Sequence, residues 1–362
     1  MLAPRLAVRL ALGLAVALVP GLTVALGSGL AAAPPVAGLP AGPALAASPV
    51  PSAGGTGAQA GGTVALAPGT AGTPLAGWPR PTVSYYEQDA NLKVLFAQGK
   101  AAGERAEQGI VILDFGRPAD GPSGPGTMGF GGRYMPFASV VAAVESFIRA
   151  YFRYAPGGTT LHVAVGTNNS CGPGQPCGHV TCGCPDEPAD LQLWGSELAS
   201  TVERLGAWAT QFKVGHGFSD SVRVVAADDA EPAFDPGFKN TYAVLKGYAD
   251  AVGGPWPAMV DSGSAEGSYW TKSQLFQVAY GFRPDVPMPQ VYYPAQASQW
   301  GALLRYAKAK RGKPMTVYGV LTEGPGAYDP GAAYAAMLRV ASAVTGQRVI
   351  PWVSTITFVP RA

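Results

Sequence analysis

Charged residues and histidines are scarce in this chain. Only 13% of the 362 residues are charged, the formal net charge is +2, and there are three histidines. No basic cluster interleaved with aromatic residues is present, so we expect no nucleic-acid partner. The histidines lack zinc-protease spacing, and the glycine-rich run 129–132 lacks the Lys-Ser or Lys-Thr of a phosphate-binding loop. We therefore predict that the protein uses no cofactor and no metal.

Cysteine is limited to four residues, Cys171, Cys177, Cys182 and Cys184, within one short segment. In an exported protein such a group predicts two disulfides. A bridge between Cys182 and Cys184 would be strained, so each of them is expected to pair with Cys171 or Cys177. The alternative is a zinc site that includes His179, although the spacing lacks the C-x2-C hairpins typical of such sites.

The first 79 residues contain almost no charge. Arg5 and Arg9 precede an apolar run and then small residues, which predicts a secretory signal peptide over 1–33. A membrane anchor is the alternative, but Pro20 and several glycines weaken a helix there. Residues 34–79 form a Pro/Ala/Gly-rich linker that cannot bury enough surface to fold. We expect a secreted protein, extracellular or cell-wall associated, with no stable membrane insertion after cleavage.

Strand and helix patterns alternate along the remaining residues, 80–362, which we expect to form one domain. Apolar segments of strand length are 110–115, 160–166, 222–227, 258–261, 289–293, 315–322 and 349–358, with 92–96 as a candidate eighth. Amphipathic helical patterns cover 137–154, 191–212, 238–252, 271–279, 295–310 and 333–344. Apolar strands separated by such helices require a parallel sheet covered by helices. The repeat predicts an α/β protein with a (β/α)8-type TIM barrel, complete or with only the seven clear strands; an open doubly wound sheet is the alternative.

Polar residues gather at the carboxyl ends of the predicted strands. These ends carry Asp114, Asn168, Asp228, Asp229, Glu231, Asp261, Tyr292, Tyr293 and Glu323. In a barrel all these ends meet at one mouth, where barrel enzymes have their active sites. The other interpretation of individual acids is helix capping, because strand-to-helix loops attract Asp and Ser.

The strand 222–227 runs directly into three carboxylates and is followed by Pro232. Side chains of a strand alternate between faces, so Asp229 and Glu231 are expected to share one face, with Cα atoms roughly 6 to 7 Å apart. Two acids on one face have their pKa values pushed apart, which divides acid and base roles between them. The alternative is a surface turn with a solvated acidic tip.

Residues suited to sugar recognition lie near the same mouth. Tyr292, Tyr293 and Trp270 offer aromatic surfaces, and Asn168 offers an amide. Asp228, Asp261 and Glu323 are further candidates for substrate binding. Trp270 has a second interpretation as a core residue at the start of a helix.

The Asp229-Ala230-Glu231 strand end together with Asp114 resembles the arrangement in barrel glycoside hydrolases of family 25, the lysozyme-like muramidases, and more distantly family 18, the chitinases. The chitinase signature D-x-x-D-x-D-x-E would need acids at 224 and 227, where Val224 and Ala227 stand. The strings 113–116, 166–170 and 229–232 are also similar to those of exported barrel-type bacterial proteins, over most of the folded part. The resemblance implies a glycoside-hydrolase-like barrel and carries no established activity with it.

Two functions compete at this point. In the first, a secreted glycoside hydrolase acts on a polysaccharide such as peptidoglycan or another polymer of N-acetyl sugars. Glu231 is its general acid, and Asp229 balances charge at the reacting centre while the substrate's acetamido group attacks. Asp114, Asp261 and Tyr292 orient the sugar or stabilise the positive charge that develops at its anomeric carbon. In the second, the barrel binds a carbohydrate or the cell wall without cleaving it.

Overall fold

The computed structural model describes residues 80–169, 187–232, 238–267, 269–323, 328–344 and 349–359. All of them belong to one compact unit, Ala67–Ala362. The predicted signal peptide, the linker and the four cysteines lie outside the described residues. Within the described ranges, no helix is long and apolar enough to cross a membrane.

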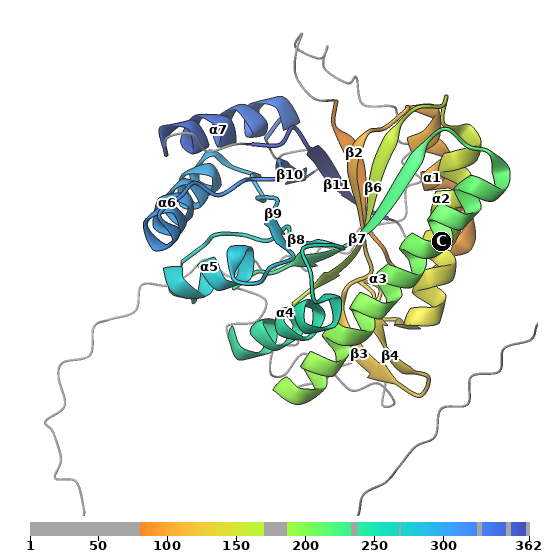
Figure 1. Cartoon of the computed structure of the whole chain (residues 1–362), viewed down its shortest axis with the longest axis horizontal. Helices are drawn as coiled ribbons and strands as arrows, with labels where there is room; N and C mark the ends of the chain where they lie inside the picture. Colours follow the sequence, from red (N-terminus) through yellow and green to blue (C-terminus); the bar gives the residue numbers. More distant parts are fainter. Residues whose placement is uncertain are drawn as a thin grey trace, which may run out of the picture. The chain divides into compact units, whose positions relative to one another are not determined.

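Eight parallel strands form the central sheet (Figure 1). They are β1 (Thr82–Tyr86), β2 (Gly109–Asp114), β6 (Thr160–Asn168), β7 (Ser221–Asp229), β8 (Met259–Asp261), β9 (Asp285–Pro287), β10 (Val320–Glu323) and β11 (Val353–Phe358). Neighbours in the sheet follow the order β10-β11-β1-β2-β6-β7-β8-β9. Each strand therefore pairs with the next barrel strand along the chain, which confirms the predicted barrel and rules out the doubly wound sheet.

The two ends of this strand order, β9 and β10, are also joined. Gln290, just after β9, makes an isolated parallel bridge with Leu321 of β10. Backbone hydrogen bonds run from Leu321 N to the Pro289 carbonyl at 2.8 Å and from Val291 N to the Leu321 carbonyl at 2.9 Å. The circle thus closes through a short contact rather than a long ladder.

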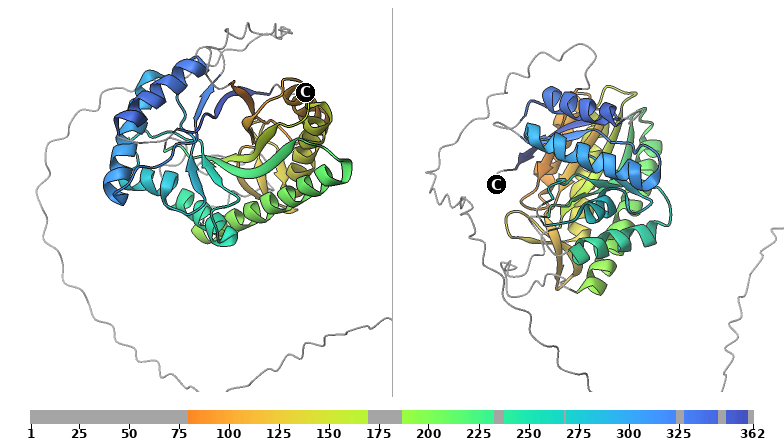
Figure 2. Two further views of the ribbon diagram at one scale, coloured as in Figure 1. Left: turned by 45° about the horizontal axis from the view of Figure 1, so that its top comes forward. Right: turned by 90° about the vertical axis from the view of Figure 1, so that its left-hand side faces the viewer.

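Seven helices of the described part surround these strands (Figure 2). They are α1 (Leu92–Glu104), α2 (Phe137–Tyr154), α3 (Pro188–His216), α4 (Phe238–Val252), α5 (Lys272–Tyr280), α6 (Pro294–Arg311) and α7 (Pro330–Ala343). The predicted helices 137–154 and 238–252 have these bounds, and the other predicted ends differ by at most four residues.

The eighth strand was predicted in the wrong place. Residues 92–96 begin α1, because the Asn91 side chain caps this helix by accepting hydrogen bonds from Lys93 N and Val94 N. The apolar residues continue at helical spacing, with Leu95, Gln98, Gly99 and Ala102 buried. Gly99 permits close contact with α2, since a Cβ there would lie 2.1 Å from the Phe147 carbonyl oxygen. The missing strand is β1, whose Val, Tyr and Tyr residues suit a strand.

A three-stranded antiparallel sheet interrupts the repeat after β2, and the sequence did not predict it. Its strands are β3 (Arg117–Gly121), β4 (Gly124–Met128) and β5 (Tyr134–Pro136). The glycine-rich run 129–132 joins β4 to β5. The indole Nε1 of Trp194 donates to the Gly126 carbonyl at 2.6 Å, which ties this small sheet to α3.

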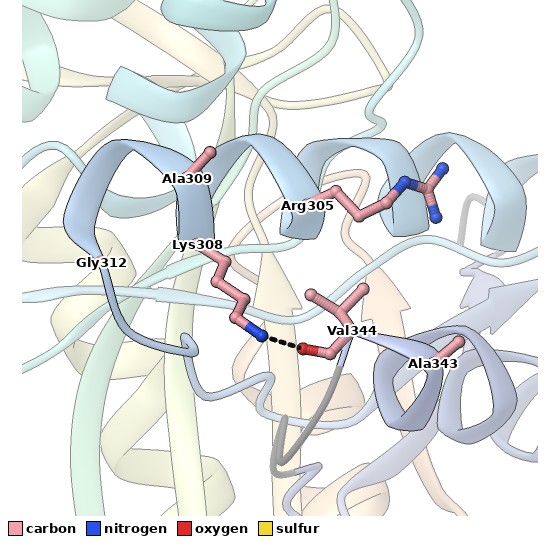
Figure 3. A pocket seen from close by; sticks show the side chains of 6 residues that line it. All are labelled: Arg305, Lys308, Ala309, Gly312, Ala343 and Val344. Atoms are coloured by element: carbon pink, nitrogen blue, oxygen red, sulfur yellow. Dashed lines mark hydrogen bonds between the residues drawn. The ribbon is translucent and has the colours of Figure 1, made fainter.

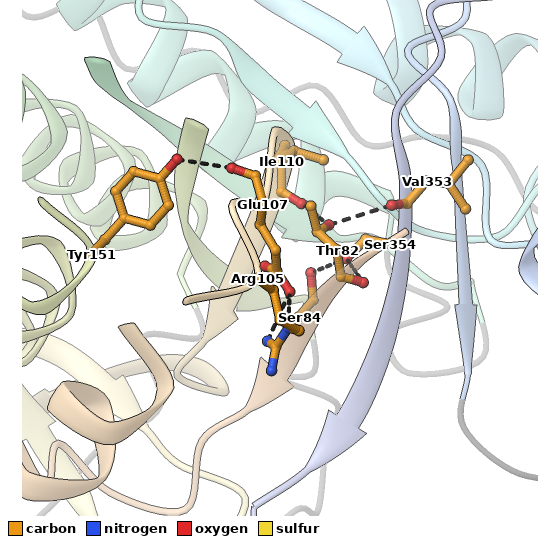
Figure 4. A network of polar contacts seen from close by, with 8 residues as sticks. All are labelled: Thr82, Ser84, Arg105, Glu107, Ile110, Tyr151, Val353 and Ser354. Carbon is orange, nitrogen blue, oxygen red and sulfur yellow. Dashed lines mark hydrogen bonds and ion pairs between the residues drawn. The ribbon is translucent and has the colours of Figure 1, made fainter. Parts of the chain in front are cut away.

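Alternate residues of each barrel strand face the barrel interior or the helices. The interior cluster consists of Tyr86, Ile110, Ile112, Ala164, Val225, Ala227, Ala258, Val260, Met288, Leu321 and Ile356. Between β1, β2 and β11 the polar side chains satisfy one another: Ser84 and Ser354 hydroxyls lie 2.6 Å apart, and Thr82 donates to the Ile110 carbonyl (Figure 4). The same view shows the ion pair between Arg105 and Glu107.

Candidate active site

A cavity of about 190 Å³ opens at the carboxyl ends of the barrel strands. It is lined by three acids, Asp229, Glu231 and Glu323, and four aromatic residues, Tyr86, Phe130, Tyr292 and Phe358. Four of these residues end barrel strands: Tyr86 ends β1, Asp229 ends β7, Glu323 ends β10 and Phe358 ends β11. Phe130 comes from the β4–β5 connection. The barrel thus brings residues far apart in the chain together at one mouth.

Asp229 lies at the buried end of this cavity. Val225 and Ala227 of the same strand face the interior, so Asp229 does too. Its Oδ2 accepts a hydrogen bond from the Tyr86 hydroxyl at 2.9 Å, and its Oδ1 accepts one from Gln290 Nε2 at 2.5 Å. Burial, followed by the Glu231 and Asp114 carboxylates, raises the pKa of Asp229 well above its usual range. Both oxygens are therefore engaged by the protein.

Glu231 stands two residues beyond Asp229 and lines the same cavity. Burial raises the pKa of Glu231 to about 7, and the carboxylates of Glu266 and Glu323 add to this, while a hydrogen bond from Gln290 acts in the opposite direction. A carboxyl group with such a pKa holds its proton up to neutral pH, which a general acid requires.

Asn169 fixes the backbone of Glu231 from the neighbouring strand. Its Oδ1 accepts from Glu231 N at 3.0 Å, and its Nδ2 donates to the Glu231 carbonyl at 3.1 Å. The same Nδ2 donates to Thr241 Oγ1 of α4 at 3.0 Å. The β6–β7 ladder ends with the pair Asn168 and Asp229, so the Asn169 side chain takes the place of the next backbone pair.

Asp114 is not among the residues that line the cavity. It is fully buried, its Oδ1 accepts from Gly116 N at 2.7 Å, and burial raises its pKa to about 7. Its proximity contributes to the raised pKa of Asp229. Asn168, the register partner of Asp229, is buried as well, and its backbone N donates to the Gly116 carbonyl at 2.9 Å.

Two predicted binding residues, Asp228 and Asp261, face away from the cavity. Ala226 and Met259, which share their strand faces, pack in the cluster between sheet and helices. Asp228 and Asp261 are register partners on β7 and β8. Both are buried, and among the described residues neither oxygen of Asp228 has a hydrogen-bond partner. Alternation explains the position of Asp228: its neighbour in β7, Asp229, faces the interior, so Asp228 faces the helices.

Asp228→Asn should reduce the loss of stability that accompanies rising pH. Burial, followed by the Asp261 and Asp114 carboxylates, raises the pKa of Asp228 well above its usual range. From about pH 4 up to its folded-state pKa, the folded chain keeps a proton that the unfolded chain releases, so the free energy of unfolding falls as pH rises. Asparagine has no such proton. Because one pKa unit corresponds to about 1.4 kcal/mol, the decrease between about pH 5 and pH 8 should shrink by more than about 1 kcal/mol.

Urea unfolding of both chains at the two pH values measures this difference. Asp250→Asn is the control, since Asp250 is an exposed α4 residue paired with Lys246. Equal pH dependence in native, Asp228→Asn and Asp250→Asn chains would contradict the cost assigned to the buried Asp228 carboxylate.

The aromatic residues predicted to bind substrate separate into three environments. Tyr292 lines the cavity. Tyr293 is 56% exposed at the start of α6. Trp270 is 2% exposed in the helix-side core, where its ring meets Phe238 edge-on at 5.9 Å, so it presents no face to the cavity. For Trp270 the structure therefore matches the core interpretation.

Several cavity residues were not selected from the sequence. Tyr86 was missed because β1 was missed, although a strand assigned to 82–86 would have placed it at the mouth. Gln290 lies in a predicted strand, but nothing in the sequence marks its amide as the hydrogen-bond partner of Asp229. Phe130 and Phe358 carry no polar group, so no chemical signal in the sequence marks them.

Another hollow lies between α6 and α7 and is lined by Arg305, Lys308, Ala309, Gly312, Ala343 and Val344 (Figure 3). Lys308 Nζ donates to the Val344 carbonyl at 3.1 Å and thereby satisfies the end of α7. None of these lining residues is an acid, so this hollow offers no carboxylate pair. In the part of the chain that the structure describes, no group of three or more His, Cys, Asp or Glu residues is arranged to hold a metal ion.

The barrel is similar to that of a hyperthermostable endo-1,4-β-D-mannanase from Thermotoga petrophila RKU-1, in a structure with maltose and glycerol. The TM-score is 0.42 and the sequence identity 10%, over 79% of this chain and 90% of that chain. No family model matches the chain, and neither does any curated protein. The likeness concerns the fold alone, and the resemblance to glycoside hydrolase families 25 and 18 stays a prediction.

Proposed function

We propose that the protein is a glycoside hydrolase that cleaves a polysaccharide at the barrel mouth. The observation that supports this most directly is the single cavity in which Glu231, Glu323 and Asp229 meet beside aromatic residues. Glycoside hydrolysis uses two carboxyl groups on either side of the scissile bond, one as a proton donor and one as a nucleophile or base.

Glu231 is the proton donor in this proposal. Its pKa of about 7 keeps the proton available, and Asn169 holds its backbone in place. The leaving glycosidic oxygen takes that proton as its bond to the anomeric carbon breaks.

Glu323 is the carboxylate partner. Asp229 is less suited to attack the sugar or a water molecule, because Tyr86 and Gln290 occupy its two oxygens. Asp229 instead fixes Tyr86 and Gln290 below the reacting centre. A separation of about 5 Å between the Glu231 and Glu323 carboxyl groups would predict retention at the anomeric carbon, and one of about 6.5 to 9.5 Å would predict inversion.

Export and the nature of the polymer are further parts of the proposal. The charge-poor opening segment supports a signal peptide, and mass spectrometry of the secreted protein would test whether that segment is removed. A polymer of N-acetyl sugars, including peptidoglycan, follows from the sequence resemblance. Incubating the full chain with cell-wall and glycan polymers and measuring new reducing ends tests the activity itself.

The activity should decline above about pH 7, because Glu231 must be protonated and its pKa is about 7. Glu266→Gln removes one of the carboxylates that raise this pKa, so the decline should move to lower pH by a fraction of a unit. The shift should shrink at high salt, since Glu266 is exposed.

Profiles of kcat/KM against pH at low and high ionic strength measure the effect. Glu197→Gln, an exposed acid on α3 away from the cavity, is the matched control and should leave the profile unchanged. A shift to higher pH in Glu266→Gln would contradict the role of Glu231 as the acid.

A further inference from the structure

The walls of the cavity combine acids with aromatic rings. Of the seven lining residues, three are acids, four are aromatic and none is Lys, Arg or His. Arg133, near Phe130 in the chain, lies 3.4 Å from the Asp89 carboxylate and is paired with it.

Such a site disfavours a negatively charged ligand. A carboxylate on the bound sugar would meet the Glu323 carboxylate and no cation among the lining residues, while the buried carboxyl groups of Asp229 and Glu231, whose pKa values are raised, could not ionise beside it. No positive side chain lines the cavity and its surroundings are buried, so a ligand carboxylate would lose water without gaining a counter-charge. The charges of the lining residues therefore disfavour anionic sugars and favour neutral or cationic ones.

Three of the aromatic lining residues, Tyr86, Phe130 and Phe358, pack against one another. The Tyr86 ring lies 4.6 Å from that of Phe130 and 4.7 Å from that of Phe358, measured between centroids. Phe358 is 54% exposed, so part of its surface remains free for a ligand. Phenyl rings offer no hydrogen bond; they pack against the apolar C–H face of a sugar ring or attract a cation.

We infer that the sugar unit bound in this cavity carries no negative charge and is a neutral sugar or an amino sugar, packed against Phe130 and Phe358. This inference rests on the proposed function, because it takes the cavity to be a sugar site. Uronic acids and other anionic sugars are excluded from this position, whereas a protonated amino group gains from both the acids and the rings.

Binding to the full chain carrying Glu231→Gln tests the inference without turnover. The probes are matched pairs of methyl glycosides that differ only in a hydroxymethyl or a carboxylate group, in the gluco, galacto and manno series, together with methyl glucosaminide. Calorimetry at low salt should show that a neutral or amino sugar binds and that its uronic acid counterpart binds at least tenfold more weakly. High salt should leave most of this ratio in place, because ions screen buried charges poorly.

Phe358→Ala, in the same background, should weaken binding of the neutral or amino sugar at least tenfold. Leu193→Ala removes another exposed apolar side chain, on α3 and outside the cavity, and should leave binding unchanged. Tighter or equal binding of the uronic acids, or no binding of any neutral or amino sugar, overturns the inference. If these sugars bind as expected but the native chain cleaves no polymer, the inference stands and the hydrolase proposal fails.

Discussion

Replacing Glu231 by glutamine should lower turnover by a factor of roughly 100 to 10,000 while leaving the fold intact. Glutamine keeps the shape of the side chain but cannot deliver a proton to the leaving oxygen. The backbone contacts of residue 231 with Asn169 do not involve its side chain, so the variant should keep its position. Initial rates on the best polymer and thermal unfolding curves measure the two effects separately.

Glu104→Gln is the control for this variant, since Glu104 is an exposed acid on α1 that pairs with Lys100. A Glu231→Gln chain with native activity would show that another group donates the proton. If no polymer is cleaved by the native chain, but binding is lost on changing Phe358 and kept on changing Glu231, the barrel is a carbohydrate-binding protein.

Glu323→Gln should reduce kcat by a factor comparable to that for Glu231→Gln, because it removes the other carboxylate of the pair. The two groups act on one transition state, so the double variant should be little slower than the slower single variant. Steady-state kinetics of the two single variants and the double variant give this comparison.

The split between kcat and KM distinguishes the role of Glu323 from simple binding. A Glu323→Gln variant that raises KM and leaves kcat unchanged would make Glu323 a binding residue, as the sequence first suggested. Glu323→Ala with added azide provides a second test, since recovery of turnover with a glycosyl azide product would identify a missing nucleophile.

The barrel could be predicted because its evidence is repeated along the chain. Apolar strands and amphipathic helices alternate from residue 110 onward, and each repeat supports the others. The strand predicted at 92–96 was wrong for a local reason. A short apolar run suits a strand or a helix equally well, and the Asn91 side chain, which caps α1, decides for the helix. The small sheet β3–β5 was not predicted, because glycine-rich strands such as β4 lack the β-branched and aromatic residues that indicate a strand.

The site was predictable where alternation within one strand settles the geometry. Asp229 and Glu231 were expected on one face, and both line the cavity. The same rule places Asp228 on the opposite face, so its prediction as a substrate-binding residue ignored the alternation within β7. Contacts between strands could not be predicted, because nothing in the sequence shows that Tyr86 and Gln290, 204 positions apart, both donate to Asp229.

The two hydrogen bonds between Asn169 and the peptide groups of Glu231 require a donor and an acceptor on one side chain. Aspartate has the same outline but supplies two acceptors, one of which would face the Glu231 carbonyl oxygen. An Asn169→Asp substitution would therefore change the hydrogen bonds of this side chain while keeping its outline. The two hydrogen bonds that Nδ2 donates, to the Glu231 carbonyl and to Thr241 of α4, would be lost, while the bond from Glu231 N to an oxygen of residue 169 would remain. Activity would then fall through the placement of Glu231 alone, while the barrel itself stays folded.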